Sequence, residues 1–349
     1  MPHAPSPPPT PPVPPTAAAV PAGRSADWRQ ELADAVRDAG ELCRLLDLPD
    51  DLAAEARRAA GNFPLLVPRR LLAAMRPGDP HDPILLQVLP RAPEAVSRPG
   101  FAADPLAERA ALAAPGLIRK YAGRALVLVT GGCAVNCRYC FRREFPYADS
   151  GATAAGVEQA CAAVAADDTI AEVILSGGDP LLLDDLRLGR LLERLAAITH
   201  LRRLRIHSRL PVVLPARITE RLVELLGGLP QTCVLVIHAN HPAELAPDVA
   251  EALRRLAAAR VMLLNQSVLL AGVNDAFETL YDLSTRLVDL GVVPYYLHLL
   301  DRVDGAAHFE VPEPRARQLH ARLQATLPGY AVPRLVREVP GEPSKSWLA

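Results

Sequence analysis

The sequence predicts an α/β fold in which parallel βα units form a full or partial barrel behind a helical N-terminal module. Half of the 349 residues are apolar, which is enough to bury a large core. Short aliphatic segments alternate about six times with longer amphipathic ones, a pattern typical of parallel βα units. The expected strands are 125–130, 171–175, 204–207, 232–238, 261–269 and 293–299. The expected helices between them are 154–166, 186–198, 218–226, 247–259 and 277–290.

The chain before the first strand has a different texture. Residues 1–24 are rich in Pro and Ala, and we expect a disordered extension there. From residue 27 to about 48 the apolar residues recur at helical spacing, which predicts one helix. Short helices and Pro-broken loops should follow. We therefore expect a helical N-terminal module over 25–114 and the barrel, with a C-terminal segment, over 115–349.

Composition excludes several classes of function. The net charge of −1 provides no electrostatic footprint for nucleic acid or an anionic membrane. No run of 18 apolar residues is present, and the N-terminus lacks the pattern of a secretory signal. Six cysteines, three of them clustered, indicate a metal site in a reducing compartment more than a disulfide framework. We expect a cytoplasmic protein.

Polar segments follow the expected strands and should share one site. The cysteine cluster, residues 176–179, 207–209 and 238–241, and Asp301 each come directly after a strand. Active sites of such barrels lie at the C-terminal ends of the strands. The sequence therefore predicts that these side chains meet at one mouth of the barrel.

The first motif is the cysteine cluster G-C-A-V-N-C-R-Y-C-F-R-R, which contains Cys133, Cys137 and Cys140. Thiolates are the natural ligands of iron–sulfur clusters. Three ligands for a four-iron cluster would leave one iron free to bind a small molecule through amino and carboxylate groups. The alternatives are a zinc site completed by a distant histidine, or unrelated cysteines. The other three cysteines are expected to be ordinary buried residues: Cys43, Cys161 and Cys233.

The second motif is S-G-G-D-P, which begins at Ser176 directly after a strand. Glycines there let a ligand approach the backbone, and free N–H groups can meet a carboxylate. Together the two motifs resemble the radical S-adenosylmethionine (SAM) enzymes. The resemblance implies a [4Fe–4S] cluster and a strand end that binds the SAM amino group through Ser176, Gly177, Gly178 and Asp179.

A more specific resemblance covers the region from residue 118 to residue 345. Among the radical SAM enzymes, this region resembles the lysine 2,3-aminomutase family, whose members are isomerases. The resemblance implies a partial (β/α)6 radical SAM barrel and a second cofactor, pyridoxal phosphate. The matching segments, in order, are I-R-K-Y-A-G-R-A-L-V-L-V-T-G-G-C-A-V-N-C-R-Y-C-F-R-R, I-L-S-G-G-D-P-L, S-R-L-P-V-V-L-P-A-R-I-T, H-A-N-H-P-A-E-L, N-Q-S-V-L-L-A-G-V-N-D and P-Y-Y-L-H-L-L-D.

Lysine usage supports the second cofactor. Only two of the 38 basic residues are lysines, Lys120 and Lys345, and a lysine amine can lose its proton whereas a guanidinium cannot. The family holds pyridoxal phosphate as a Schiff base on a lysine that matches Lys345 in V-P-G-E-P-S-K. The alternative is a solvated lysine in a frayed tail. By the same resemblance, Lys120, Tyr121 and Arg124 would hold the cofactor phosphate.

The resemblance also suggests the substrate. Asp301 and Glu338 match two acidic positions that grip the lysine ammonium, and Arg142 would pair with the substrate carboxylate in bidentate geometry. Carboxylates in the pocket argue against glutamate as the substrate, and only weakly against arginine. The matching segments further imply that SAM is lined by Ser208, Arg209, His238 and Gln266, unless these are core residues that hydrogen-bond within the protein.

Three departures point to one branch of the family. Glu338 stands where aspartate is expected, P-G-E-P-S-K replaces a polyglycine run, and the sequence stops four residues after Lys345. These features resemble the bacterial branch that makes (R)-β-lysine for elongation factor P, which implies L-lysine, an electron donor protein, elongation factor P and its lysine ligase as partners. Two other hypotheses are a radical enzyme without pyridoxal phosphate and a non-enzymatic, metal-stabilised binding module.

Overall fold

The computed structural model describes residues 27–349, so the extension expected over residues 1–24 lies outside the described part. A single ten-stranded sheet runs in the order β1 to β10. Its centre consists of seven consecutive parallel strands. They are β3 (Arg124–Thr130), β4 (Glu172–Gly177), β5 (Arg203–Ser208), β6 (Thr232–Ile237), β7 (Met262–Val268), β8 (Val293–His298) and β9 (Arg334–Arg337).

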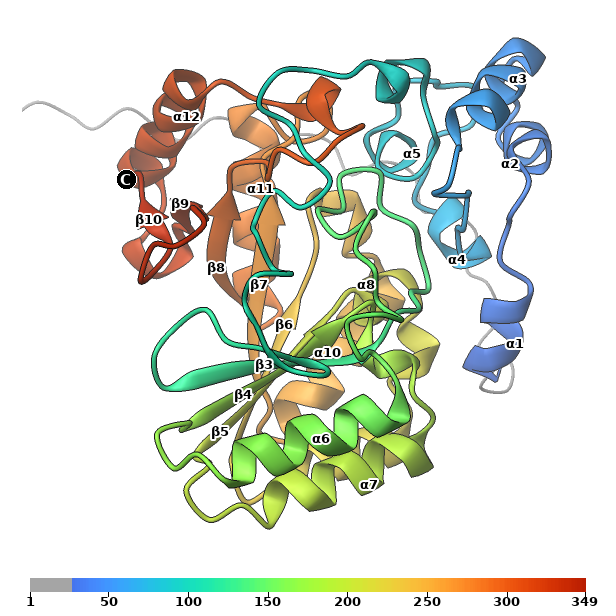
Figure 1. The fold of residues 1–349 in the computed structure, drawn as a ribbon. Helices are drawn as coiled ribbons and strands as arrows, with labels where there is room; N and C mark the ends of the chain where they lie inside the picture. The colour runs from blue at the N-terminus through green and yellow to red at the C-terminus, as the bar shows by residue number, and fades with distance from the viewer. Residues whose placement is uncertain (1–26) are drawn as a thin grey trace, which may run out of the picture.

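A helix follows each of the first six parallel strands, which gives six βα units. Figure 1 shows α6 and α7 covering the outer face of β3, β4 and β5. Side-chain caps begin several helices where the sequence has Thr or Asp: Thr153 starts α6, Asp184 starts α7 and Thr219 starts α9. The helices are α6 (Ala154–Ala165), α7 (Asp185–Ala196), α9 (Glu220–Gly227), α10 (Pro247–Ala258), α11 (Phe277–Asp289) and α12 (Glu313–Thr326).

Antiparallel strands extend the sheet at both edges. β1 (Leu112–Ala114) and β2 (Leu117–Ile118) form a hairpin whose second strand pairs with β3. At the other edge β10 (Ser346–Trp347) pairs with β9. The strand order does not return from β10 to β1, so the barrel is open. The predicted α/β fold with a partial (β/α)6 barrel is confirmed.

Short helices complete the barrel and form most of the N-terminal region. The N-terminal ones are α1 (Trp28–Ala33), α2 (Ala39–Leu45), α3 (Asp50–Ala59), α4 (Arg69–Leu72), α5 (Pro83–Leu86) and the 3-10 turn η1 (Ala92–Ala95). Their apolar faces join one continuous core with the barrel. Within the barrel the short elements are η2 (Pro180–Leu182), α8 (Leu210–Val213), η3 (Pro215–Arg217), η4 (Pro242–Glu244), η5 (Ala307–Phe309) and η6 (Gly329–Ala331).

The single helix predicted from residue 27 to about 48 is wrong. Between α1 and α2 the chain extends, and Val36 exchanges two backbone hydrogen bonds with Val67, of 2.8 and 3.0 Å. Asp38 then starts α2, because its side chain accepts a bond from the Glu41 amide at 2.9 Å. Asp38 also pairs with Arg57 of α3. Tertiary pairing therefore overrides a helical periodicity that continues across the break.

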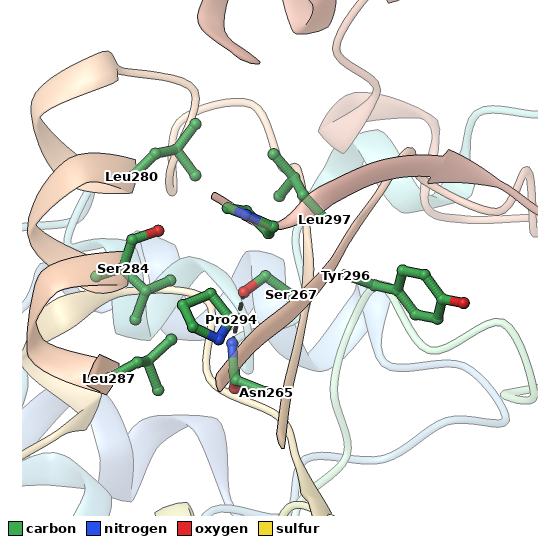
Figure 2. Close-up of a pocket in the computed structure, with 10 residues that line it drawn as sticks. Asn265, Ser267, Leu280, Ser284, Leu287, Pro294, Tyr296 and Leu297 are labelled. Carbon is green, nitrogen blue, oxygen red and sulfur yellow. Dashed lines mark hydrogen bonds between the residues drawn. The ribbon is translucent and has the colours of Figure 1, made fainter. Parts of the chain in front are cut away.

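The two faces of the sheet carry different residues, as Figure 2 shows where α11 packs on β7 and β8. Asn265 and Ser267 point toward the helix, and the Asn265 amide donates to the Ser267 hydroxyl at 2.8 Å. Tyr296 points away from the helix. Since side chains alternate along a strand, Gln266 lies on the inner face with Tyr296, and both line the central cavity.

No helix among residues 27–349 is long and apolar enough to cross a membrane.

Candidate active site

The inner face of the barrel encloses a cavity of about 520 Å³. Every residue that the sequence analysis assigned to a cofactor or to the substrate lines it, although these residues come from separate segments. These residues are Lys120, Tyr121, Arg124, Cys133, Cys137, Cys140, Arg142, Ser176, Gly177, Gly178, Asp179, Ser208, Arg209, His238, Gln266, Asp301, Glu338 and Lys345. The parallel strands bring these segments together because their C-terminal ends meet at one side of the sheet. Residues 239–241 of the polar segment after β6, which were also expected in the site, do not line the cavity.

The N-terminal region holds the cysteine loop that follows β3. The Asn136 amide donates to the Leu66 carbonyl at 3.1 Å, and the Arg138 amide donates to the Gln87 carbonyl at 2.8 Å. The Arg138 guanidinium is fully buried and pairs with Glu94, with Nε donating at 2.9 Å. A loop without regular secondary structure is thus fixed at several points by segments preceding the barrel.

The three thiols of this loop fit a cluster better than a single metal ion. Burial raises the pKa of Cys133 well above its usual value and that of Cys140 to about 11, so metal binding is needed to stabilise the thiolates. Within residues 27–349, no three Cys, His, Asp or Glu side chains group closely enough to hold one ion. Each thiolate of a four-iron cluster binds a different iron, so the donor set suits the cluster.

The glycines after β4 are required by backbone packing. A Cβ on Gly178 would lie 2.0 Å from the Gly132 carbonyl oxygen, and Gly177 has a φ of +123°, which favours glycine. The amides of Gly178 and Asp179 donate to the carbonyls of Thr130 and Gly132, both at 2.7 Å. The expectation that this segment offers free N–H groups is therefore wrong for these two amides. The strand end is packed against the cysteine loop.

Asp179 organises the next strand end. Its carboxylate accepts bonds from the Ser208 hydroxyl at 2.7 Å and from the backbone amides of Leu181, Arg209 and Leu210 at 2.8 to 3.1 Å. It is fully buried, and desolvation raises its pKa despite these donors. Asp179 and Ser208 thus line the cavity while bonding to each other, and they join β4 to β5.

Arg209 lies beneath the cysteine loop. Its Nη1 donates to the Cys137 sulfur at 2.7 Å, and its Nη2 donates to Gln87 at 2.7 Å and to Glu244 at 2.9 Å. The pair with buried Glu244 compensates the desolvation of the guanidinium. Arg209 thus connects a cysteine ligand to both the N-terminal region and the end of β6.

Arg142 binds a carboxylate that sequence reasoning missed. Glu108 accepts bonds from Nε at 2.6 Å and from Nη2 at 2.9 Å, while Nη1 donates to the Ser176 hydroxyl at 2.9 Å and to the Gly177 carbonyl at 3.2 Å. The Glu108 side chain is only 3% exposed, and Arg142 and Lys120 keep its pKa below the usual value against desolvation. The bidentate fork expected for the substrate is filled by Glu108.

Both lysines meet the same acidic residue. Lys120 Nζ lies 2.8 Å from Glu338 Oε1 and 3.1 Å from Glu108 Oε1. Lys345 pairs with the other oxygen of Glu338. Although desolvation opposes ionisation, the two lysines lower the Glu338 pKa to about 2. Glu338 is therefore ionised and engaged.

Asp301 is the unengaged acid of the cavity. Among the described residues, the cavity's ion pairs use Glu108 and Glu338, and none includes Asp301. Burial, followed by repulsion from Glu338, raises the Asp301 pKa to about 7. A cation entering the cavity would lower this pKa and gain a charge-assisted partner.

Two arginines on the inner face suit an anionic group. The Nε atoms of Arg124 and Arg205 are buried without a hydrogen-bond partner in the described part of the chain, and both residues line the cavity. The Arg124 guanidinium also stacks 4.5 Å from the centre of the Tyr121 ring. A phosphate could satisfy both Nε donors, so these residues fit pyridoxal phosphate, whereas Lys120 is held by carboxylates.

Three imidazoles line the cavity. His238 was expected to line the SAM pocket and His207 was expected at the shared mouth, whereas His298 was not predicted. Burial lowers the pKa of His238 to about 4 and those of His207 and His298 well below the usual value. All three are therefore neutral near pH 7. The Nε2 atoms of His238 and His298 have no partner among the described residues and are free to bond a ligand.

Some of the cavity residues that were not predicted are marked by a pattern in the sequence, and others are not. Arg205 lies two residues before His207 on one face of β5, so the period of two along this strand could have identified it from His207, which was already expected in the site. His298 likewise ends β8. Glu108 lies in an irregular turn before the sheet, where the Asp104 side chain accepts its amide at 2.9 Å. No periodicity marks it, and only the tertiary structure reveals its role.

Comparison with known proteins identifies the family of this chain. Residues 127–283 match the Radical SAM superfamily. The L-lysine 2,3-aminomutase of Escherichia coli is 50% identical over 323 residues, covering 92% of this chain and 94% of that protein. The proteins of the same name from Haemophilus influenzae and Clostridium subterminale are 45% and 34% identical, covering 93% and 92% of this chain and 96% and 77% of theirs. This chain is therefore an isomerase of the radical SAM superfamily and belongs to the L-lysine 2,3-aminomutase family.

Proposed function

We propose that this protein converts L-lysine to (R)-β-lysine with a [4Fe–4S] cluster, SAM and pyridoxal phosphate. The observation that carries the proposal is the carboxylate of Asp301, which forms no ion pair among the described residues and lies on the same cavity as Lys345. An amino acid with a cationic side chain supplies the partner that Asp301 lacks. The similar proteins named L-lysine 2,3-aminomutase agree with this choice.

The charges of the cavity define how the substrate binds. The side-chain ammonium of the substrate lysine pairs with Asp301, because Glu338 is already engaged by Lys120 and Lys345. The substrate carboxylate faces Arg142, whose one uncommitted N–H is on Nη2. A glutamate side chain would meet the Asp301 carboxylate and be repelled.

The proposal also gives each cofactor its place on the cavity. When bound, the cluster and SAM supply the 5′-deoxyadenosyl radical, and pyridoxal phosphate carries the migrating amino group. Cys133, Cys137 and Cys140 hold the cluster. SAM is bound by the end of β4 together with His238 and Gln266. Lys345 holds pyridoxal phosphate through its amino group, with Arg124 and Tyr121 near the phosphate. The buried cavity excludes water and oxygen from the reacting groups.

Turnover by the reconstituted protein tests the proposal. Protein purified without oxygen and loaded with iron and sulfide is incubated with reductant, SAM, pyridoxal phosphate and L-lysine, and β-lysine is measured by chiral chromatography. Product should require both Cys137 and Lys345, and the Cys137→Ala and Lys345→Ala variants should form none. Cys161→Ala is the matched control, because Cys161 is buried in α6 away from the cavity.

Competing substrates make the same experiment selective. Arginine and glutamate are offered in place of lysine under identical conditions. SAM cleavage with unchanged lysine would retain the radical chemistry and contradict the aminomutase proposal. β-Arginine in place of β-lysine would reassign the substrate that Asp301 binds. A protein that contained zinc and no iron would favour the binding-module hypothesis.

We further propose that the β-lysine modifies elongation factor P in the cytoplasm, with help from a lysine ligase and an electron donor protein. The support is the resemblance of the cysteine segment, Glu338 and the P-G-E-P-S-K loop to that branch. A cluster that must be reduced also requires a reducing compartment. Mass spectrometry of elongation factor P from cells with and without this gene would test the proposal. An unchanged mass would contradict it.

A further inference from the structure

The carboxylate of Glu108 joins two of the cations that face the substrate cavity, Arg142 and Lys120. Oε1 accepts from Arg142 Nη2 at 2.9 Å and lies 3.1 Å from Lys120 Nζ, while Oε2 accepts from Arg142 Nε at 2.6 Å. Leu106, two residues earlier, is also buried and lines the cavity. The Glu108 backbone is itself held, because the Asp104 carboxylate accepts the amides of Glu108 and Arg109 at 2.9 and 3.1 Å. This carboxylate is thus built into the cavity wall.

The contacts of Glu108 limit what each cation can offer to a ligand. Arg142 uses four of its five N–H groups, two on Glu108 and two on Ser176 and Gly177. Lys120 has two of its three N–H groups directed at Glu108 and Glu338. Each cation therefore has a single N–H left for an anion in the cavity.

Glu108 differs from Glu94, another buried carboxylate of the region before the barrel, because only Glu108 binds cations that line the cavity. Glu94 also binds two arginines, Arg138 and Arg143, and its side chain is 2% exposed. Neither Glu94 nor its two arginines line the cavity. Glu94 therefore fixes the cysteine loop from outside, whereas Glu108 acts on groups that face the ligands.

We propose that Glu108 is a positioning residue, which orients Arg142 for the substrate carboxylate and, through Arg142, fixes the β4 strand end where SAM binds. Without Glu108, Arg142 and Lys120 would repel each other across a buried space and Arg142 could rotate. The freed guanidinium would still attract a carboxylate, so substrate binding would persist while alignment was lost. The inference rests on the proposed function for the substrate and on the proposed SAM position.

Glu108→Gln tests the inference, since it keeps the shape and removes the charge. In the reduced, cluster-loaded protein without lysine, the change that SAM causes in the electron paramagnetic resonance spectrum gives its Kd. We expect this Kd to rise about fivefold, because the Ser176 and Gly177 contacts loosen. With lysine, kcat should fall about tenfold or more while KM is unchanged or lower. Glu108→Asp should recover part of both losses.

Glu94→Gln is the matched control, since it also removes a buried carboxylate from two arginines. It should lower thermal stability, while its SAM Kd, measured per loaded cluster, stays within about twofold of the wild type. Wild-type SAM affinity and kcat in Glu108→Gln, a raised KM at unchanged kcat, or no recovery in Glu108→Asp would each overturn the inference. If Glu108→Gln did not fold, Glu108→Asp would be measured instead. It should then show a smaller rise in the SAM Kd and a smaller fall in kcat without a raised KM, and wild-type values in Glu108→Asp would overturn the inference. A wild-type protein that does not convert lysine would refute the proposed function, while the SAM measurement would still test Glu108.

Discussion

Lys345 forms an ion pair with Glu338 across the hairpin of β9 and β10. The strand register explains the contact: Ser346 stands opposite Arg337 in the antiparallel pair, so Lys345, which precedes Ser346, lies across from Glu338, which follows Arg337. Glu338 also holds Lys120. The lysine proposed to carry the cofactor is thus positioned by a carboxylate that it shares with the only other lysine of the chain.

Replacing Glu338 by Gln should make stability in acid less dependent on pH. The folded pKa of Glu338, about 2, lies below its ordinary value of 4.5, so its ionised form stabilises the fold above pH 4.5. That contribution is lost as pH falls from 4.5 toward 2. Thermal unfolding of the cofactor-free protein at several pH values would show a steeper loss in the wild type than in Glu338→Gln. Equal slopes would contradict the assignment.

Asp301→Asn should stabilise the cofactor-free protein at high pH and abolish lysine turnover. The folded pKa of Asp301, about 7, lies above its ordinary value of 3.8, so ionisation costs stability as pH rises through this window. The variant should gain up to about 4 kcal/mol at pH 8 and little at pH 4. Melting temperatures across that range would test this, and a gain equal at both pH values would refute the raised pKa.

Lysine turnover by the wild type should depend on the same group. Below pH 7 the carboxyl of Asp301 is increasingly protonated and no longer pairs with the substrate ammonium. We expect KM for lysine to rise as pH falls from 8 to 6. Initial rates over this range would measure the change, with SAM binding in the absence of lysine as the control for the rest of the site. A constant KM would place the ammonium elsewhere.

Gly178→Ala should disrupt both the cysteine loop and the β4 strand end. The added Cβ would lie 2.0 Å from the Gly132 carbonyl oxygen, so one backbone segment must shift. SAM cleavage should fall about a hundredfold, as expected when reacting groups move by about 1 Å. In Gly329→Ala the added Cβ has no atom within 4 Å, and activity should be unchanged. Normal SAM cleavage in Gly178→Ala would show that the packing tolerates a side chain.

Glu94→Gln should lower stability and iron content together. It leaves the fully buried Arg138 without its ionic partner, which costs about 3 to 5 kcal/mol in comparable buried pairs. The exposed pair of Glu251 and Arg254 provides the control, because Glu251→Gln should change stability by less than about 1 kcal/mol. Chemical denaturation and iron analysis measure both effects. Loss of iron without loss of stability would point to a direct role of Glu94 at the cluster.

Periodicity predicted the parts of the fold that repeat. Six parallel strands and five helices lie within a few residues of the expected positions, because the strands are short aliphatic segments and the helices repeat their apolar residues at helical spacing. The helix α12 was missed, although Ala316, Leu319 and Leu323 form an apolar stripe on it. Its many charged residues hid that stripe. β9 was also missed, since its four residues are too short to show a pattern.

The candidate site likewise contains residues that local motifs predicted and residues that only tertiary contacts reveal. Motif residues such as the three cysteines were found because their spacing is local, and the parallel strands then gathered them around one cavity. Glu108 was missed because its importance depends on Arg142 and Lys120, which are 34 and 12 residues away in the sequence. The engagement of Glu338 by both lysines could not be predicted either, since opposite charges far apart in sequence reveal no pairing.

β10 gives Lys345 a freedom that the cysteines do not have. This edge strand contains two residues, and Trp347 beside Lys345 is 63% exposed. The cysteine loop, in contrast, is held by buried bonds from several segments. Amide protons of β10 should therefore exchange with deuterated water by local opening, long before those of the strands at the centre of the sheet. The Lys345 end of the cavity should therefore open more readily than the cysteine end.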